Sequence, residues 1–260
     1  MLITRVATAA VGVPVIIALI FIGDWPYAIA VAFALGIAAA EWAHFWHRWF
    51  APMTLFAGAF TFALTLAVHA RGGEATFVML IVGSALVLVR MAAAGTAEPS
   101  PAWAPGGILY AGVLGGTMVL LRNLDDGRDW VFLAILGTFA VDTCAYFTGR
   151  SIGRRKLAPR ISPKKTWEGF FGGWIGGAVV IVALNALLAT DAGAAPIAAI
   201  AVLLPLFATA GDLAESALKR AVGVKDASNL IPGHGGAMDR LDSLLFTFPL
   251  VWTVARVWVG

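Results

Sequence analysis

The chain has 260 residues, of which 60% are hydrophobic and only 13% charged, and its mean hydropathy is +0.86. A soluble domain carries roughly 25% charged residues, so the composition excludes a disordered chain and an ordinary soluble domain and favours a polytopic membrane protein. The net charge of +3 is too small to indicate nucleic-acid binding, and a single cysteine, Cys144, excludes both a disulfide framework and a Cys-based zinc site.

Continuous apolar segments follow one another along most of the chain. Because a helix of about 20 apolar residues crosses the hydrocarbon core, each segment is a candidate span. The nine segments are 6–23, 26–46, 51–69, 75–94, 106–121, 130–148, 170–190, 194–210 and 243–259. Their apolar runs do not alternate, which favours helices over barrel strands. The predicted fold is an all-α, polytopic transmembrane helical bundle of about nine spans, with cytoplasmic polar loops forming the active site.

The charged residues are segregated from these segments. Only Glu41, Arg90, Asp142 and Arg256 fall inside the expected spans. Fourteen of the 18 Lys and Arg residues lie on the side that holds the N-terminus and the polar segments 149–169 and 211–242. The positive-inside rule therefore predicts a plasma-membrane protein with its N-terminus in the cytoplasm and its C-terminus outside.

Two of the acids inside expected spans are Asp142 and Glu41. A carboxylate near the bilayer centre costs roughly 2.5–3.5 kcal/mol, so we expect Asp142 to face a wet cavity or a partner. The alternative is that its span is shorter and that Asp142 caps a helix. Glu41 precedes His44 and His47 at a spacing that suits a metal, but no third ligand is evident, so this Trp-rich stretch is interpreted as an interfacial belt.

The segment 149–169, GRSIGRRKLAPRISPKKTWEG, carries seven Lys or Arg residues. Ser162 before Pro163 predicts a helix start with proline in the first helical position. The residues that follow would then crowd the positive end of that helix, where anions bind. The alternative is a basic juxtamembrane patch that contacts anionic lipid.

The segment 211–242 begins with GDLAESALKR, which predicts a helix. Asp212, Ser216 and Lys219 would share one face of it, beside Glu215. A carboxylate, a hydroxyl and an ammonium on one face suit a metal-bound phosphate. The alternative is a solvated helix with favourable ion pairs.

A glycine-rich turn, IPGHGG, follows at 231–236, and glycines let backbone N–H groups approach an anion closely. Asp239 and Asp242 come next, at the mouth of the last span. Asp212 and Asp239 flank the turn and could share one Mg²⁺, which prefers carboxylate and phosphate oxygens. Lys225 and Arg240 could hold the remaining phosphates. The alternative is a glycine-rich turn in which Asp239 caps a helix.

The stretch SALKRAVGVKDASNLIPGHGGAMDRLD resembles the signature of the phosphatidate cytidylyltransferases, also called CDP-diacylglycerol synthases. The matching positions are Ser216, Lys219, Arg220, Lys225, Asp226, Pro232, His234, Gly235, Gly236, Asp239, Arg240 and Asp242. Upstream, DTCAYFTGRSIGRRKLAPRISPKKTWEG is also similar to the family, which typically has a small residue in place of Cys144. The resemblance covers about 140–245. It implies N-terminal membrane spans in 1–129, which match only as a generic hydrophobic region, and a catalytic membrane region in 130–260.

The resemblance implies a reaction in phospholipid biosynthesis: CTP and phosphatidic acid give CDP-diacylglycerol and pyrophosphate, with Mg²⁺ required. Catalytic roles are expected for Asp212, Asp239, Lys219 and Asp142, with Asp212 and Asp239 as metal ligands. Substrate-binding roles are expected for Ser162, Lys164, Lys165, Thr166, Ser216, Arg220, Lys225, His234, Gly235, Gly236 and Arg240. The nucleophile would be the lipid phosphate itself, so no Ser or Cys nucleophile is required.

Two other functions stay open at this point. A different CTP-dependent membrane enzyme, acting on another lipid phosphate, would share the metal and triphosphate chemistry. A transporter would also have many spans and an intramembrane acid, but it would not need two polar segments rich in phosphate-binding residues. The expected partners are CTP, phosphatidic acid and membrane lipids, with no nucleic acid; a homodimer is left open.

Overall fold

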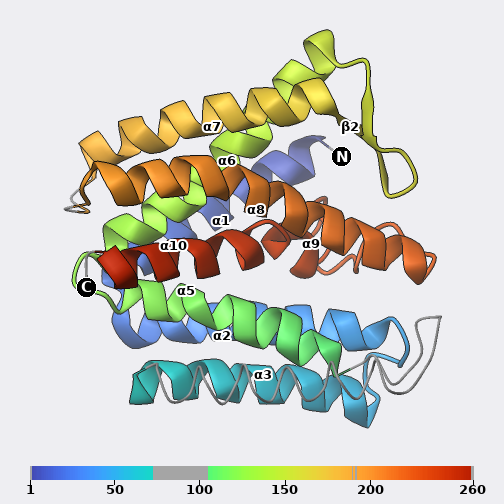
Figure 1. Cartoon of the computed structure of the whole chain (residues 1–260). Helices are drawn as coiled ribbons and strands as arrows, with labels where there is room; N and C mark the ends of the chain where they lie inside the picture. The colour runs from blue at the N-terminus through green and yellow to red at the C-terminus, as the bar shows by residue number, and fades with distance from the viewer. Residues whose placement is uncertain (1, 73–104, 189, 191, 259–260) are drawn as a thin grey trace, which may run out of the picture. The chain divides into compact units, whose positions relative to one another are not determined.

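The computed structural model describes residues 2–72, 105–188, 190 and 192–258, and most of these residues are helical (Figure 1). The expected span 75–94 lies outside the described residues. The chain forms two compact units: Met1–Asn123 with Ala221–Leu241, and Leu124–Arg220 with Asp242–Gly260. The second half of the family signature therefore packs with the N-terminal helices. The functional division at 129/130 stays a prediction.

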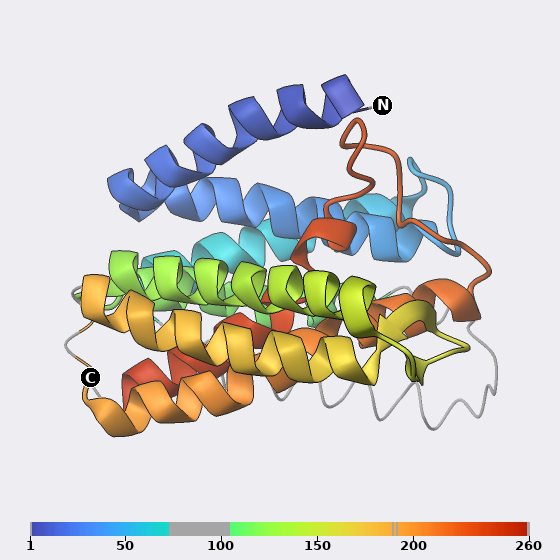
Figure 2. The same cartoon turned by 90° about the horizontal axis from the view of Figure 1, so that it is seen from above.

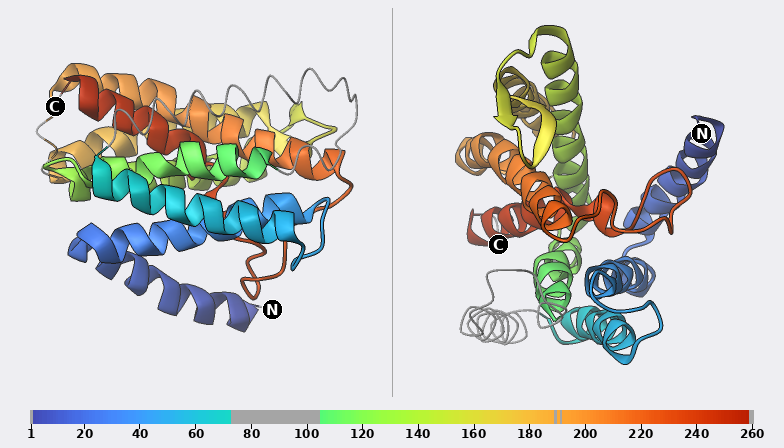
Figure 3. Two further views of the ribbon diagram at one scale, coloured as in Figure 1. Left: turned by 90° about the horizontal axis from the view of Figure 1, so that it is seen from below. Right: turned by 90° about the vertical axis from the view of Figure 1, so that its right-hand side faces the viewer.

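In the described part of the first unit, the named elements are helices and the segment 222–237 is irregular. Its elements are α1 (Leu2–Ile22), α2 (Asp24–His44), α3 (Pro52–Arg71), the π-helix η2 (Ile108–Leu114), α5 (Gly115–Arg122) and the short α9 (Met238–Leu241). Helices α2 and α3 lie side by side, as Figure 3 shows. They approach closely where Gly36 faces Gly58: a Cβ at Gly36 would lie 2.9 Å from the Gly58 carbonyl oxygen.

The second unit contains four helices and one hairpin. Its elements are α6 (Gly127–Ile152), β1 (Lys156–Ala158), β2 (Ser162–Thr166), α7 (Trp167–Leu187), α8 (Ala194–Ala221) and α10 (Leu244–Trp258). Figure 2 shows α6 and α7 packed along their lengths. Glycines of α7 allow this packing, because a Cβ at Gly173 would lie 2.8 Å from the Ala145 side chain of α6. A bond of 3.0 Å between the Thr138 and Thr247 hydroxyls joins α6 to α10.

Within the described residues, five helices are long and apolar enough to cross a membrane: α2, α3, α6, α7 and α8. Shorter apolar helical stretches are Val6–Ile22, Ile108–Arg122 and Leu244–Trp258. This pattern is typical of an integral membrane protein and confirms the predicted all-α membrane class. The count of nine spans stays a prediction.

The predicted helix start at Ser162 is wrong. Residues 162–166 form strand β2, which pairs with β1 in an antiparallel hairpin. The residue before a proline disfavours the helical region, which agrees with an extended chain at Ser162. The helix begins at Trp167 instead, because Thr166 is extended and its Oγ1 accepts the Gly169 N–H at 3.1 Å.

Two other local predictions are settled by the helix bounds. The segment GDLAESALKR is helical, as expected, and it continues the apolar helix α8 without a break up to Ala221. Asp142 does not cap a shorter helix, because α6 continues beyond it to Ile152. It is therefore a carboxylate within a membrane-length helix.

Candidate active site

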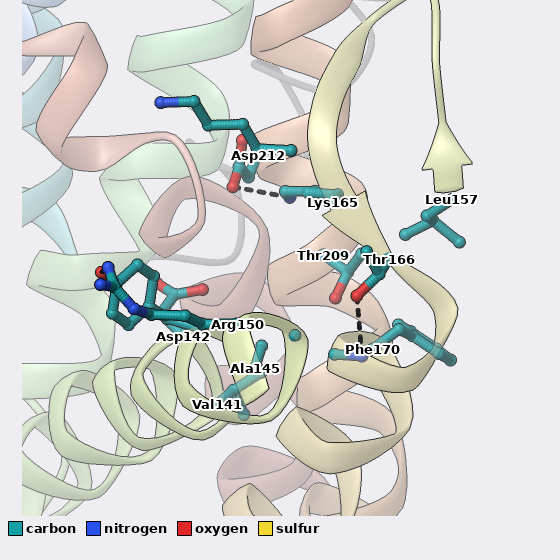
Figure 4. A pocket seen from close by; sticks show the side chains of 14 residues that line it. Val141, Asp142, Ala145, Arg150, Leu157, Lys165, Thr166, Phe170, Thr209 and Asp212 are labelled. Carbon is teal, nitrogen blue, oxygen red and sulfur yellow. Dashed lines mark hydrogen bonds and ion pairs between the residues drawn. The ribbon is translucent and has the colours of Figure 1, made fainter. Parts of the chain in front are cut away.

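A cavity of about 490 Å³ opens in the second unit, between α6, the hairpin, the start of α7, and α8 (Figure 4). Its polar lining residues are Asp142, Arg150, Lys164, Lys165, Thr166, Thr209 and Asp212. Its apolar lining residues include Val141, Ala145, Leu157 and Phe170. The expectation that Asp142 faces a cavity is confirmed. A cavity lined by both charged and apolar side chains suits an amphiphilic phosphate compound.

The polar segments 149–169 and 211–242 meet in this cavity through an ion pair. Lys165 Nζ lies 2.6 Å from Asp212 Oδ2, and their side chains are 24% and 29% exposed. Ser216 also donates its hydroxyl to Asp212 Oδ1 at 3.3 Å, so this part of the predicted helix face is confirmed. Because both charges remain partly hydrated, the pair is weakly held and can exchange for a stronger anion or cation.

The Lys219 side chain is largely buried. Its Nζ lies 3.1 Å from Glu215 Oε2, and the two side chains are only 11% and 1% exposed. The i, i+4 spacing of this pair is visible in the sequence, where it predicts a favourable ion pair. The ammonium group of Lys219 is therefore largely shielded from solvent and is paired with Glu215.

Asp242 lies close enough to Asp212 to be affected by its charge, a proximity that the sequence analysis did not predict. Burial and the nearby negative charge of Asp212 raise the pKa of the Asp242 carboxyl, while its hydrogen bonds to the Ser243 N–H and to Glu215 and the charge of Lys219 act in the opposite direction. In sequence Asp242 stands beside Asp239. In the structure it belongs to the unit that contains Asp212.

The hairpin places the remaining residues of 162–166 in distinct roles. Lys164 lines the cavity and is exposed, whereas Thr166 is only 6% exposed and caps α7. Ser162 pairs with Ala158 in the hairpin. Arg220, at the end of α8, donates from Nε to the Ile161 carbonyl at 3.4 Å and so contacts the hairpin turn. Lys164 and Lys165 are thus the residues of this segment that the cavity can present to a phosphate.

The glycine-rich turn lies in the first unit. The Ile231 N–H donates to the Gly235 carbonyl at 2.8 Å, which closes the turn. Gly233 and Gly235 adopt φ values of 78° and 88°, a left-handed backbone that favours glycine. His234 is half-buried in this turn, whereas Lys225 and Arg240 are exposed beside it.

Asp239 holds this turn from within. Its Oδ2 accepts the N–H groups of Ala227 at 2.9 Å and Gly236 at 2.8 Å, and the residue is 8% exposed. These contacts resemble the alternative in which Asp239 has a structural role, because its carboxylate organises the turn. A role as metal ligand stays a prediction, since Asp212 belongs to the other unit.

No three His, Cys, Asp or Glu side chains form a ready metal centre in the described part of the chain. The donor chemistry nevertheless fits Mg²⁺. Asp142 and Asp212 line one cavity, and the charge of Asp212 reaches Asp242. Hard carboxylate oxygens that leave room for water and phosphate are the set this ion uses.

Glu41 is the second residue that sequence reasoning missed. It is 0% exposed, and its carboxylate accepts hydrogen bonds from Ser228 Oγ at 2.6 Å, the Ala237 N–H at 3.0 Å and the Met238 N–H at 2.7 Å. The available signal was an acid inside an apolar span, which indicates function by default. The N-terminal spans are therefore more than a generic hydrophobic region.

Comparison with known proteins identifies the family of this chain. The model of the "Cytidylyltransferase family" matches residues 3–258. The chain is 43% identical over 150 residues to a phosphatidate cytidylyltransferase of Bacillus subtilis, a match that covers 55% of this chain and 54% of that protein. It is 39% identical over 195 residues to the Brucella suis enzyme of the same name, covering 72% and 67%.

A third relative of that name, from Staphylococcus saprophyticus, is 40% identical over 144 residues, covering 55% of each chain. The matched part thus spans between about half and two thirds of the length of these relatives. The family model, in contrast, spans almost the whole chain. The chain belongs to the cytidylyltransferase family.

Proposed function

We propose that this protein is a phosphatidate cytidylyltransferase, which converts CTP and phosphatidic acid to CDP-diacylglycerol and pyrophosphate. The observation that carries the proposal is the cavity in which Lys165 and Asp212 meet, within a chain matched to the family over residues 3–258. Two of its relatives, at 43% and 39% identity, carry the name of this activity. The charged lining residues suit phosphates, and the apolar lining residues suit the lipid.

In this reaction an oxygen of the lipid phosphate forms a bond to the α-phosphorus of CTP, and the bond from that phosphorus to the pyrophosphate oxygen breaks. The nucleophile is already an ionised phosphate, so the protein contributes positioning and charge stabilisation. Lys164 and Lys165 bind phosphate oxygens at the cavity wall. Lys165 leaves Asp212 for the phosphate, since a charge-assisted bond to phosphate is stronger than a hydrated ion pair.

The proposed cofactor is Mg²⁺. Asp212 would hold it in the cavity of the second unit, with Asp142 and Asp242 as neighbouring acids; Asp239, which the sequence proposes as the second ligand, belongs to the first unit. When bound, the ion offsets negative charge on the phosphates. Asp212 suits this role because its carboxylate is partly exposed and contacts the side chains of Lys165 and Ser216. In a role as metal ligand, Asp239 would also keep its hydrogen bonds to the turn.

The proposal includes a topology of nine spans in the plasma membrane, with the N-terminus and both polar segments cytoplasmic and the C-terminus outside. The distribution of Lys and Arg supports it. Reporter fusions after Gly193 and after Gly260 are expected to report the outer side. A cytoplasmic signal from the C-terminal fusion would contradict the span count.

A direct assay tests the activity. The purified protein in detergent is given radiolabelled CTP with phosphatidic acid or, in a parallel arm, with a polyprenyl phosphate, with Mg²⁺ or with EDTA. The expected product is CDP-diacylglycerol, formed only with phosphatidic acid and Mg²⁺. Turnover of the polyprenyl phosphate alone would point to another lipid substrate, and no turnover in either arm would contradict the proposal.

A further inference from the structure

Glu41 joins an N-terminal helix to the glycine-rich signature turn within the first unit. It lies near the end of α2, and its three hydrogen-bond donors all belong to the segment 228–238. Ser228 stands before the turn, and Ala237 and Met238 stand after it. One carboxylate therefore holds both ends of the turn. Figure 2 shows this segment, in orange, beside the N-terminal helices of its own unit.

The turn is shaped around this carboxylate. A Cβ at Gly236 would lie 2.5 Å from Glu41 Oε1 and 2.6 Å from Oε2. Gly236 has no left-handed φ, so close approach, and not backbone freedom, requires glycine there. The Asp239 side chain binds the Gly236 N–H from the other side at 2.8 Å. Two carboxylates from different elements thus bracket the same residue.

A carboxylate matches this environment better than any other side chain of its size. All three of its partners are donors, and an ionised carboxylate only accepts. A glutamine in the same place would accept with its carbonyl oxygen, but its NH₂ group would face a donor. A buried acid in an apolar span is unfavourable unless it is fully hydrogen-bonded, so packing alone does not account for Glu41.

We propose that Glu41 is a positioning residue for the reaction: it holds segment 228–238 so that His234 and the adjoining Arg240 are presented to substrate. This inference rests on the proposed function. Glu41 is 0% exposed and touches no substrate, so it acts only through the turn. The N-terminal spans thereby contribute to the active site.

The test compares Glu41→Gln with Tyr27→Phe. Tyr27 lies on the same helix, is buried, and donates one hydrogen bond to the Met118 carbonyl, away from the turn. Hydrogen exchange followed by mass spectrometry reports on peptides covering 227–241. In Glu41→Gln we expect faster exchange there and unchanged exchange in the hairpin 156–166. Turnover of CTP and phosphatidic acid should fall roughly ten- to hundredfold in kcat/KM, the effect of leaving one or two buried donors unsatisfied. Tyr27→Phe should change neither.

The outcomes separate the two proposals. Normal exchange in Glu41→Gln, or faster exchange with normal kcat/KM, overturns the positioning role. A wild-type protein without CTP turnover overturns the proposed function, whereas the exchange data would still test whether Glu41 stabilises the turn. If Glu41→Gln does not fold, Ser228→Ala removes one of the three bonds and should shift exchange and kcat/KM in the same direction by a smaller factor. No shift in Ser228→Ala overturns the inference.

Discussion

The cavity of the second unit and the glycine-rich turn of the first are both organised by aspartate, in opposite ways. Asp212 is 29% exposed, and its partners are the Lys165 and Ser216 side chains. Asp239 is 8% exposed, and its Oδ2 binds two backbone N–H groups. Side-chain partners with water nearby are exchanged easily, whereas backbone amides of a folded turn are not. We therefore expect the cavity contacts to rearrange when a ligand binds, whereas the turn is already closed by its own hydrogen bonds.

The two acids inside helices repeat this contrast. Asp142 faces the cavity, where solvent and substrate can reach it, whereas Glu41 is enclosed by three donors. Each avoids the cost of an isolated charge in an apolar helix by a different route. An acid inside a span thus either lines a cavity, as Asp142 does, or joins two segments, as Glu41 does, and its contacts distinguish the two cases.

The largest expected effect is that of Asp212→Asn. Asn keeps the shape and removes the charge, so a lost metal ligand should nearly abolish turnover at saturating Mg²⁺, well beyond the tenfold loss that ~1.4 kcal/mol of barrier represents. CDP-lipid formation across a Mg²⁺ titration measures it. Asp24→Asn is the control, because Asp24 is an exposed acid paired with His69 and should leave the rate normal. A rate above about a tenth of wild type in Asp212→Asn would show that Asp212 is not a required ligand.

Asp239→Asn separates the structural role of Asp239 in the turn from its proposed role as a metal ligand. The Asn carbonyl oxygen can still accept the Ala227 and Gly236 N–H groups, so the turn should survive, with a loss of about 1 kcal/mol of stability or less. If Asp239 also binds Mg²⁺, turnover should nevertheless nearly vanish. Activity in the same titration, with hydrogen exchange of 227–241, distinguishes the two roles. An intact turn with near-normal activity would leave Asp239 with a structural role alone.

A smaller loss is expected for Lys165→Ala. Losing a charge-assisted bond to phosphate should lower kcat/KM for CTP by roughly 1.5–3 kcal/mol, or about ten- to 150-fold. Arg155→Ala should do much less, because Arg155 lies outside the cavity wall and uses its backbone N–H to bind Glu168. Equal losses in steady-state kinetics would mean that segment 149–169 acts only as a general electrostatic surface.

The smallest expected effect concerns pH and stability without metal. Burial and the charge of Asp212 raise the pKa of Asp242, so the folded protein binds this proton more tightly than the unfolded chain does. The ionised carboxylate therefore lowers stability as the pH rises from its ordinary pKa of about 3.9 through the raised value. In EDTA, Asp242→Asn should raise the Tm at pH 7–8, by about 2–4 °C for each kcal/mol relieved, and by less near pH 4. A Tm difference that does not depend on pH would contradict this.

Segregation of charge from apolar segments was sufficient to predict a helical membrane protein, because the bilayer selects strongly on composition. The chemistry of the site was readable too: SPKKT, the 212–219 face and the glycine turn are short patterns whose residue types bind phosphate. The hairpin was not, because Pro163 suits both a helix start and an extended strand, and only pairing with β1 and the Thr166 cap decides between them.

What the tertiary structure alone decided is which residues meet. Lys165 and Asp212 are 47 positions apart along the chain, and Glu41 and Met238 are separated by 197. The sequence by itself indicated that an acid inside an apolar span, such as Asp142, needs a wet cavity or a partner, since a lone charge among apolar helices is costly. It did not name the partners, because a hydrogen bond between distant segments depends on how whole helices pack, and that packing leaves no local pattern. Asp242 belongs to the unit that contains Asp212, and Asp239 to the turn of the other unit, although only two residues separate them.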